Sequence, residues 1–229
     1  MIAASLMTVP AQSAGPPGSK LTIAVKPSVV TLGSRVKIDG HLTLSNLAQP
    51  GHVVRLFAQR FPYRHSYRAI ASTTTSGNGG YVFRIGFPRN THVKTLADNG
   101  TESAAKLAVT LPRLHLSSSE SKNARRLRVT LSGRSPGYVS LGGRVVVYLG
   151  NASAHSLGVV GHPRMRHVHA GLSRMSAVFT LPKSWKGGYR LGTCYSAPRS
   201  TGMYQPGFRC PHRFQYIATG AAVATAYRP

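Results

Sequence analysis

Short apolar runs separated by turns make up most of the sequence, and no stretch repeats apolar residues with the 3.6-residue period of a long helix. The 24 glycines and 15 prolines fall singly or in pairs between these runs, where they favour tight turns. In segment 35–44, RVKIDGHLTL, Val36 and Ile38 alternate with Lys37 and Asp39, as in a strand that buries one face. This pattern predicts an all-β protein.

Two tandem domains are predicted, because the order of segments in the first half recurs in the second. Seven strands are expected before residue 112, beginning with 21–25, and one last strand is expected over 214–226. Segments 125–133, 142–150, 176–182 and 188–195 match 34–42, 50–58, 80–88 and 90–98, in that order. We therefore expect a leader and linker at 1–19, a first β-sandwich at 20–112 and a second at 113–229.

Segment 73–95, TTTSGNGGYVFRIGFPRNTHVKT, with LGSRVKIDGHL and PGHVVRLFAQR before it, resembles the bacterial immunoglobulin-like (Ig-like) domains of secreted actinobacterial proteins. The matching residues are Gly33, Val36, Gly40, Val54, Leu56, Thr75, Gly79, Tyr81, Phe83 and Pro88. The resemblance covers 21–111, and the second half keeps Phe179, Pro182 and Tyr189. It implies two Ig-like sandwiches and an extracellular scaffold or adhesive role, and it implies no catalytic residues.

Charge is the most unusual feature of the composition. There are 29 lysines and arginines against four acids, which gives a net charge of +25 and a pI of about 11.5. The basic residues are spread from Lys20 to Arg228, which indicates a basic folded surface rather than a basic tail. Such a surface attracts polyanions, and the candidates are anionic wall polymers, nucleic acid and anionic lipid.

The first 19 residues and the cysteines favour an exported protein. Residues 1–19 are mostly small or apolar, and small residues at Ala11 and Ala14 resemble the end of a secretory signal, although a basic start and a full apolar core are missing. Cys194 and Cys210 are expected to form a disulfide in an exported chain. No run of about 20 apolar residues exists, so no transmembrane span is expected.

Two segments combine arginines with aromatic residues. They are RFPYRHSYR at 60–68 and the loop YSAPRSTGMYQPGFR between the two cysteines. Such combinations can stack on bases or sugar faces, although in an exposed turn the same residues can also be solvent-exposed without any binding role. The candidate ligand-binding residues are Arg60, Tyr63, Arg64, Tyr67, Arg68, Arg199, Tyr204, Phe208 and Arg209.

Catalytic patterns are weak. Asp98 and Glu102 are close in sequence, but they lie in a segment typical of a loop. GRSPG at 133–137 matches the G-x-S-x-G nucleophile motif, yet Pro136 lacks the N–H that would form the oxyanion hole. We therefore expect no enzymatic activity and no cofactor.

Three histidines, His162, His167 and His169, are weak candidates for a zinc or copper site. On a strand, His167 and His169 would point to the same side. No carboxylate or thiol nearby in the sequence completes a ligand set, so no bound metal is expected.

These observations predict a secreted or envelope-associated, non-catalytic binding or scaffold protein. We expect a monomer that contacts an anionic envelope polymer or another surface protein. The alternative is a nucleic-acid-binding basic protein, although no specific nucleic-acid motif is present. A cell-wall hydrolase or a metal-binding protein would fit less well.

Overall fold

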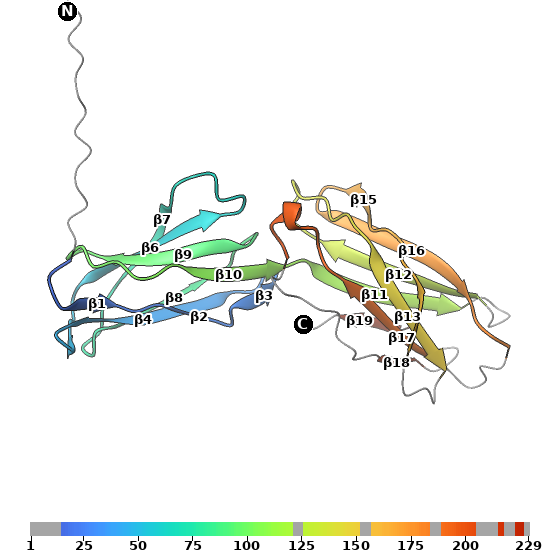
Figure 1. Cartoon of the computed structure of the whole chain (residues 1–229), viewed down its shortest axis with the longest axis horizontal. Coiled ribbons are helices and arrows are strands. Elements are labelled where there is room, and N and C mark those ends of the chain that lie inside the picture. Colours follow the sequence, from blue (N-terminus) through green and yellow to red (C-terminus); the bar gives the residue numbers. More distant parts are fainter. Residues whose placement is uncertain are drawn as a thin grey trace, which may run out of the picture.

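The computed structural model describes residues 15–120, 126–151, 157–183, 189–204, 215–217 and 223–226. Within them the chain forms two β-sandwiches in tandem (Figure 1). They are joined where β10 (Lys106–Leu111) passes into β11 (Arg113–Glu120), with the buried Pro112 between the two strands. Apart from one short 3-10 helix, η1 (Arg199–Thr201), every described element is a strand, so the all-β prediction is confirmed.

The first sandwich is built around β4, which pairs antiparallel with every other strand of its sheet. That sheet contains β1 (Ser19–Leu21), β2 (Ala24–Lys26), β4 (Val36–Leu44), β5 (Leu47–Ala48) and β8 (Gly80–Ile85). The facing sheet has the order β3-β10-β9-β6-β7. Its further strands are β3 (Val29–Thr31), β6 (Val53–Arg60), β7 (Arg68–Thr74) and β9 (Thr91–Ala97), and β3 runs parallel to β10.

The second sandwich pairs a sheet of order β15-β16-β12-β11-β19 with a sheet of order β14-β13-β17-β18. The first of these adds β12 (Arg126–Arg134), β15 (Arg166–His169), β16 (Leu172–Thr180) and β19 (Val223–Ala226) to β11. The second contains β13 (Val145–Asn151), β14 (Gly158–Gly161), β17 (Tyr189–Tyr195) and β18 (Gln215–Ile217). All the pairings in this domain are antiparallel.

Both sandwiches have an Ig-like strand order. In each, the second and fifth main strands pair in one sheet (β4 with β8, β12 with β16), while the third and sixth pair in the other (β6 with β9, β13 with β17). These four strands of each domain are the segments whose order recurs in the sequence. The Ig-like fold predicted from the sequence is thus observed in both halves.

Two strand predictions were wrong in detail. The expected first strand at 21–25 is divided between β1 and β2, and the chain then crosses to the other sheet as β3, after Pro27, which has no N–H for a ladder. The expected last strand at 214–226 is instead two strands in opposite sheets, because β18 pairs with β17 and β19 pairs with β11.

Alternate residues of the strands fill one core in each domain. In the first core Ile38, Leu42 and Leu56 are completely buried, and each contributes roughly 2 kcal/mol by leaving water. Among the residues that the structure describes, the second core holds eighteen buried ones, and Met203 from the turn after η1 is one of them. None of the described residues forms a helix with the length and hydropathy that a membrane crossing needs.

Two residues of the Ig-like motif, Tyr81 and Gly40, have structural roles. The Tyr81 hydroxyl donates to the Thr22 carbonyl and shares a hydrogen bond of 2.9 Å with Thr95. Gly40 lies beneath this contact, and a Cβ at this position would come within 1.9 Å of the Thr22 oxygen. Burial raises the pKa of Tyr81 to about 12, so its hydroxyl remains a donor at neutral pH.

Candidate binding surface at the domain junction

The two predicted binding segments meet at the junction of the sandwiches. The hairpin between β6 and β7 reaches the turn that follows η1, and Asn90 lies between them. The Asn90 backbone N–H donates to the Gly202 carbonyl at 2.7 Å, and its side-chain Nδ2 donates to the Tyr204 carbonyl at 2.7 Å. The Asn90 carbonyl accepts from the Phe61 N–H at 3.0 Å. One residue therefore links the hairpin of the first domain to the turn of the second.

Asn90 is a buried polar residue whose hydrogen-bonding capacity is largely satisfied. It is 0 % exposed, and its fourth group, Oδ1, accepts from the Thr110 N–H on β10 at 2.9 Å. Burying an amide costs free energy unless its groups find partners, and here each of them does. Asn90 therefore favours a single arrangement of the hairpin, β10 and the η1 turn.

Close packing supports these hydrogen bonds. Gly202 has a φ of +65°, and a Cβ on it would lie 2.5 Å from ring carbons of Phe61. Only glycine avoids both the backbone strain and the clash at this point. A second bridge is the Arg89 guanidinium, which lies 4.4 Å from the ring centroid of Tyr138 in the second domain. In addition, Leu32 packs against the core of the second domain.

Three tyrosines cluster over this contact. Burial, together with smaller contributions from the neighbouring phenols of Tyr204 and Tyr67, raises the pKa of Tyr63 to about 12. Tyr63 also meets the His92 ring edge-on, with 4.6 Å between centroids. Lys94 Nζ lies 4.7 Å from the ring centroid of Tyr67. The cluster therefore presents neutral phenols beside cationic groups.

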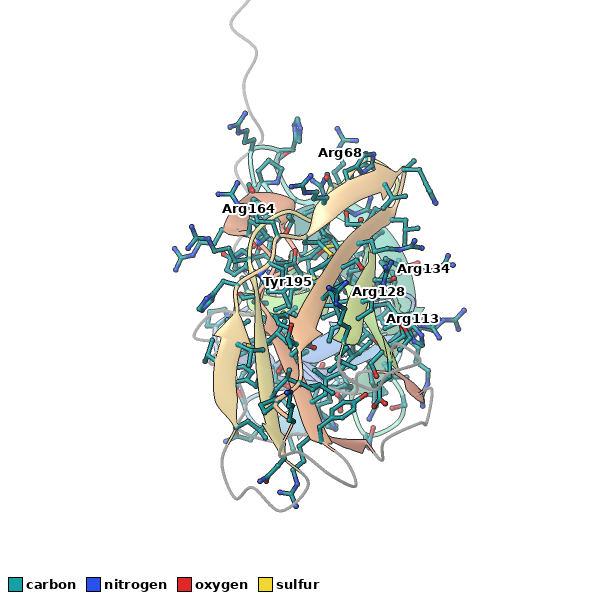
Figure 2. The ribbon with its side chains drawn as sticks, turned by 90° about the vertical axis from the view of Figure 1, so that its right-hand side faces the viewer. Arg68, Arg113, Arg128, Arg134, Arg164 and Tyr195 are labelled. Atoms are coloured by element: carbon teal, nitrogen blue, oxygen red, sulfur yellow. The ribbon has the colours of Figure 1, made fainter. Side chains whose placement is uncertain are left out.

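Four of the predicted arginines are exposed beside the tyrosines. Three come from the hairpin and the fourth from η1, where the Arg199 guanidinium lies 5.8 Å from the Tyr204 ring centroid. Figure 2 shows Arg68 projecting at the rim of the molecule. We call this set the junction surface: Arg60, Tyr63, Arg64, Tyr67, Arg68, Arg199 and Tyr204. Phe208 and Arg209, which were predicted to belong to it, lie outside the described residues.

Asn90 was not predicted as a functional or structural centre. It follows the strand-ending proline by two residues, which is typical of an ordinary turn asparagine. No local signal separates such a residue from one that joins two domains, because its partners at 110, 202 and 204 are distant in the sequence.

The acidic residues are mostly engaged within the first domain. Lys37 Nζ lies 3.3 Å from Asp39 Oδ2, and Lys94 Nζ lies 2.7 Å from Glu102 Oε1. Asp98 accepts from the Val53 N–H at 2.9 Å and shares a contact of 2.7 Å with His52. These two contacts hold the pKa of Asp98 below its usual value, and the hydrogen bond from the Val53 backbone contributes more than the contact with His52. Asp98 and Glu102 thus bind different partners and form no carboxylate pair.

Ser135 of the GRSPG motif has a structural role. Its hydroxyl donates to the Val139 carbonyl at 2.6 Å, and its N–H donates to the Gly171 carbonyl at 3.0 Å. The residue is buried at the end of β12, so its oxygen closes a turn and is not presented to a substrate.

The prediction that His167 and His169 point to the same side is wrong. A β-bulge in β15 pairs His167 with Ser173 but His169 with the adjacent Leu172, so the two histidines fall on opposite faces. His162 precedes β15 and is exposed. No group of three histidine, cysteine, aspartate or glutamate side chains suited to a metal occurs among the described residues.

Cys194 is 3 % exposed in β17, opposite Val146 of β13. Cys210 lies outside the described residues, and the disulfide between them stays a prediction.

Comparison with known proteins adds no functional information. No family model and no curated protein matches the sequence. Among solved structures, the chain is similar to a transglutaminase from red sea bream, with 14 % identity, a TM-score of 0.35, and coverage of 80 % of this chain and 30 % of the other. It is also similar to a mutant α2-macroglobulin from Salmonella, with 13 % identity, a TM-score of 0.34, and coverage of 95 % and 16 %. The chain spans less than a third of either protein, and the Ig-like description rests on its own strand order.

Proposed function

We propose that this chain is a secreted or envelope-associated, non-catalytic binding or scaffold protein that contacts anionic cell-wall polymers. The observation that carries this proposal is the junction surface, where two segments distant in the sequence place four exposed arginines around three tyrosines. Guanidinium groups bind phosphate and carboxylate through paired hydrogen bonds, and tyrosine rings stack on sugar faces. A polymer of charged sugars or phosphates offers both kinds of contact.

The distribution of acids supports an anionic ligand. The ion pairs Lys37–Asp39, His52–Asp98 and Lys94–Glu102 all use an acid of the first domain. The remaining acid, Glu120, lies on the core side of β11 beside Tyr189. Burial is the main cause of the raised pKa of the Tyr189 phenol, and the charge of Glu120 also raises it. The lysines and arginines of the second domain therefore far outnumber its acid, and this excess of positive charge attracts external anions.

The proposed location rests on the sequence. The leader-like start and the cysteine pair favour export, as does the resemblance to Ig-like domains of secreted actinobacterial proteins. The non-catalytic role and the monomeric state are likewise expectations from the sequence.

The direct test compares binding of the full chain to bacterial cell-wall fragments before and after their anionic polymers are removed. Two variants carry the same loss of charge: the junction triple Arg64→Gln, Arg68→Gln and Arg199→Gln, and the control triple Arg35→Gln, Arg55→Gln and Arg84→Gln. All six arginines are exposed. We expect binding that depends on the anionic polymers and is weakened more by the junction triple. Equal binding to stripped walls would refute the proposal.

Single-stranded nucleic acid is the second candidate, because tyrosines interleaved with arginines can stack on successive bases. If this is the ligand, the protein should bind a single-stranded oligonucleotide more tightly than it binds intact walls at the same salt concentration. Substitution of Tyr63 and Tyr67 by leucine would then reduce oligonucleotide affinity, because each stacked base contributes about 1–3 kcal/mol.

A further inference from the structure

A second basic surface is formed by residues other than those of the candidate site, on the outer face of the sheet β15-β16-β12-β11. In β12 and β16, alternate residues are buried in the core and the residues between them face solvent. Six of the outward residues are exposed arginines, and Figure 2 shows three of them, Arg113, Arg128 and Arg134, on one side of the domain. We call this surface the arginine face: Arg113, Arg126, Arg128, Arg134, Arg166 and Arg174.

The strand register places like charges directly opposite one another on this face. Arg113 pairs with Arg134 across β11 and β12, and Arg166 pairs with Arg174 across β15 and β16. Like charges at directly opposed positions destabilise a sheet. Within the described residues no carboxylate on these four strands points to this face, since Glu120 is on the core side. No carboxylate of the face therefore offsets the repulsion within these two pairs, which suggests that an external anion offsets it.

The rest of the face suits a polar polymer. The outward residues between the arginines are mainly hydroxyl-bearing: Ser117, Ser119, Thr130, Ser132, Ser176 and Thr180. The large apolar side chains at the outward positions of β16 are Val178, which is 52 % exposed, and the half-buried Leu172 opposite Arg134, and Val168 of β15 is 49 % exposed. Insertion into a membrane surface relies on a continuous set of bulky apolar side chains, whereas arginines and hydroxyl-bearing residues outnumber the apolar ones on the described strands of this face.

We propose that the arginine face binds a linear polymer with repeated phosphate groups, which lies across the strands. This inference rests on the proposed function in that it assumes an anionic polymer as ligand. Neighbouring strands are about 4.8 Å apart, and alternate residues of one strand are about 6.8 Å apart, so the guanidinium groups form a flat array of repeated cations. Each phosphate can accept two hydrogen bonds from one guanidinium group and keeps its negative charge across the physiological pH range.

The array is large enough to hold several repeat units. From β11 to β15 there are three strand spacings, or about 14 Å, and from Arg126 to Arg134 along β12 the distance is about 27 Å. Affinity is therefore expected to rise with polymer length until the face is spanned, because the additional contacts form within one complex.

The test measures binding of the full chain to linear inorganic polyphosphate by fluorescence anisotropy over a series of salt concentrations. The face triple Arg113→Gln, Arg128→Gln and Arg174→Gln is compared with the control triple Arg35→Gln, Arg55→Gln and Arg84→Gln, which removes the same charge from the first domain. The slope of log affinity against log salt is negative, and loss of three phosphate contacts should reduce its magnitude by about 2. The control triple should leave the slope within about 0.5 of the wild-type value. Circular dichroism and thermal unfolding check that both variants are folded.

Equal weakening by both triples would overturn the assignment to this face. Equal binding of polyglutamate of the same charge, which carries carboxylates in place of phosphates, would overturn the choice of a phosphate polymer. If polyphosphate does not bind but cell walls do, this inference fails and the proposed function stands. If neither binds, both fail.

Discussion

Replacing Asn90 by alanine should weaken the joint between the two domains. The backbone hydrogen bonds of residue 90 survive the change, but the two side-chain bonds to Thr110 N–H and the Tyr204 carbonyl are lost. Thr110 is completely buried, so its unsatisfied N–H costs about 2 kcal/mol, whereas the Tyr204 carbonyl on a half-buried residue costs about 1 kcal/mol. The free energy of unfolding should therefore fall by about 3 kcal/mol.

Urea denaturation followed by circular dichroism measures this loss. With a slope of about 2 kcal/mol per molar urea, the midpoint should move down by about 1.5 M. Hydrogen exchange at the Thr110 amide supplies a local readout, because that amide loses its acceptor. Asn78→Ala is the matched control, since the Asn78 oxygen accepts the Gly80 N–H at 3.0 Å in an exposed turn where water can replace it.

Two outcomes would show this reasoning to be mistaken. One is an Asn90→Ala midpoint within error of the Asn78→Ala midpoint. The other is an unchanged exchange rate at Thr110. Asn90→Asp separates the two bonds: it keeps an oxygen for Thr110 but turns a second oxygen toward the Tyr204 carbonyl. Small-angle scattering should then report a looser pair of domains, while exchange at Thr110 stays slow.

Three further predictions follow from single contacts. Gly202→Ala should lower stability by about 1–3 kcal/mol in thermal unfolding, because its Cβ meets the Phe61 ring at a positive φ, and Gly142→Ala, where the Cβ would have open space, is its control. Arg113→Ser should raise stability by about 0.5 kcal/mol at low salt and by less at high salt, since it removes a like charge opposite another arginine; a loss of stability would contradict this explanation. Asp98→Asn should destabilise the protein at neutral pH, and the difference from wild type in urea midpoint should shrink as the pH falls. The folded pKa of that carboxyl lies below its usual value, so its stabilisation is present above the unfolded pKa and is lost as pH falls through the folded pKa; a pH-independent difference would exclude this explanation.

Local patterns were enough to predict the strands that bury one face. The alternation in 35–44 predicted β4, and the recurrence of segment order predicted equivalent strands in the two halves, because side chains alternate between the faces of any strand. Deviations from regular strands were not predictable in this way. The bulge that separates His167 from His169 arises from pairing with β16, which local sequence does not specify.

The candidate site was predictable only in its parts. The arginines and tyrosines of the junction surface were identified from composition, as residue types that bind anions and sugars. That the two segments would meet was not predictable, because their contact depends on how the sandwiches dock, through Asn90 and the Phe61–Gly202 packing. The same dependence on docking explains why the sequence did not predict that Asn90 joins the two domains.

The sequence by itself determined an all-β protein with two sandwiches, a strongly basic surface and few acids to offset it, because alternation, turn residues and charge are properties of the chain. Only the tertiary structure decided which charges became neighbours. Arg113 and Arg134 are distant in sequence, and strand register makes them directly opposed. Register and domain docking are set by packing over the whole fold, so the positions of both basic surfaces could not be read from any single segment.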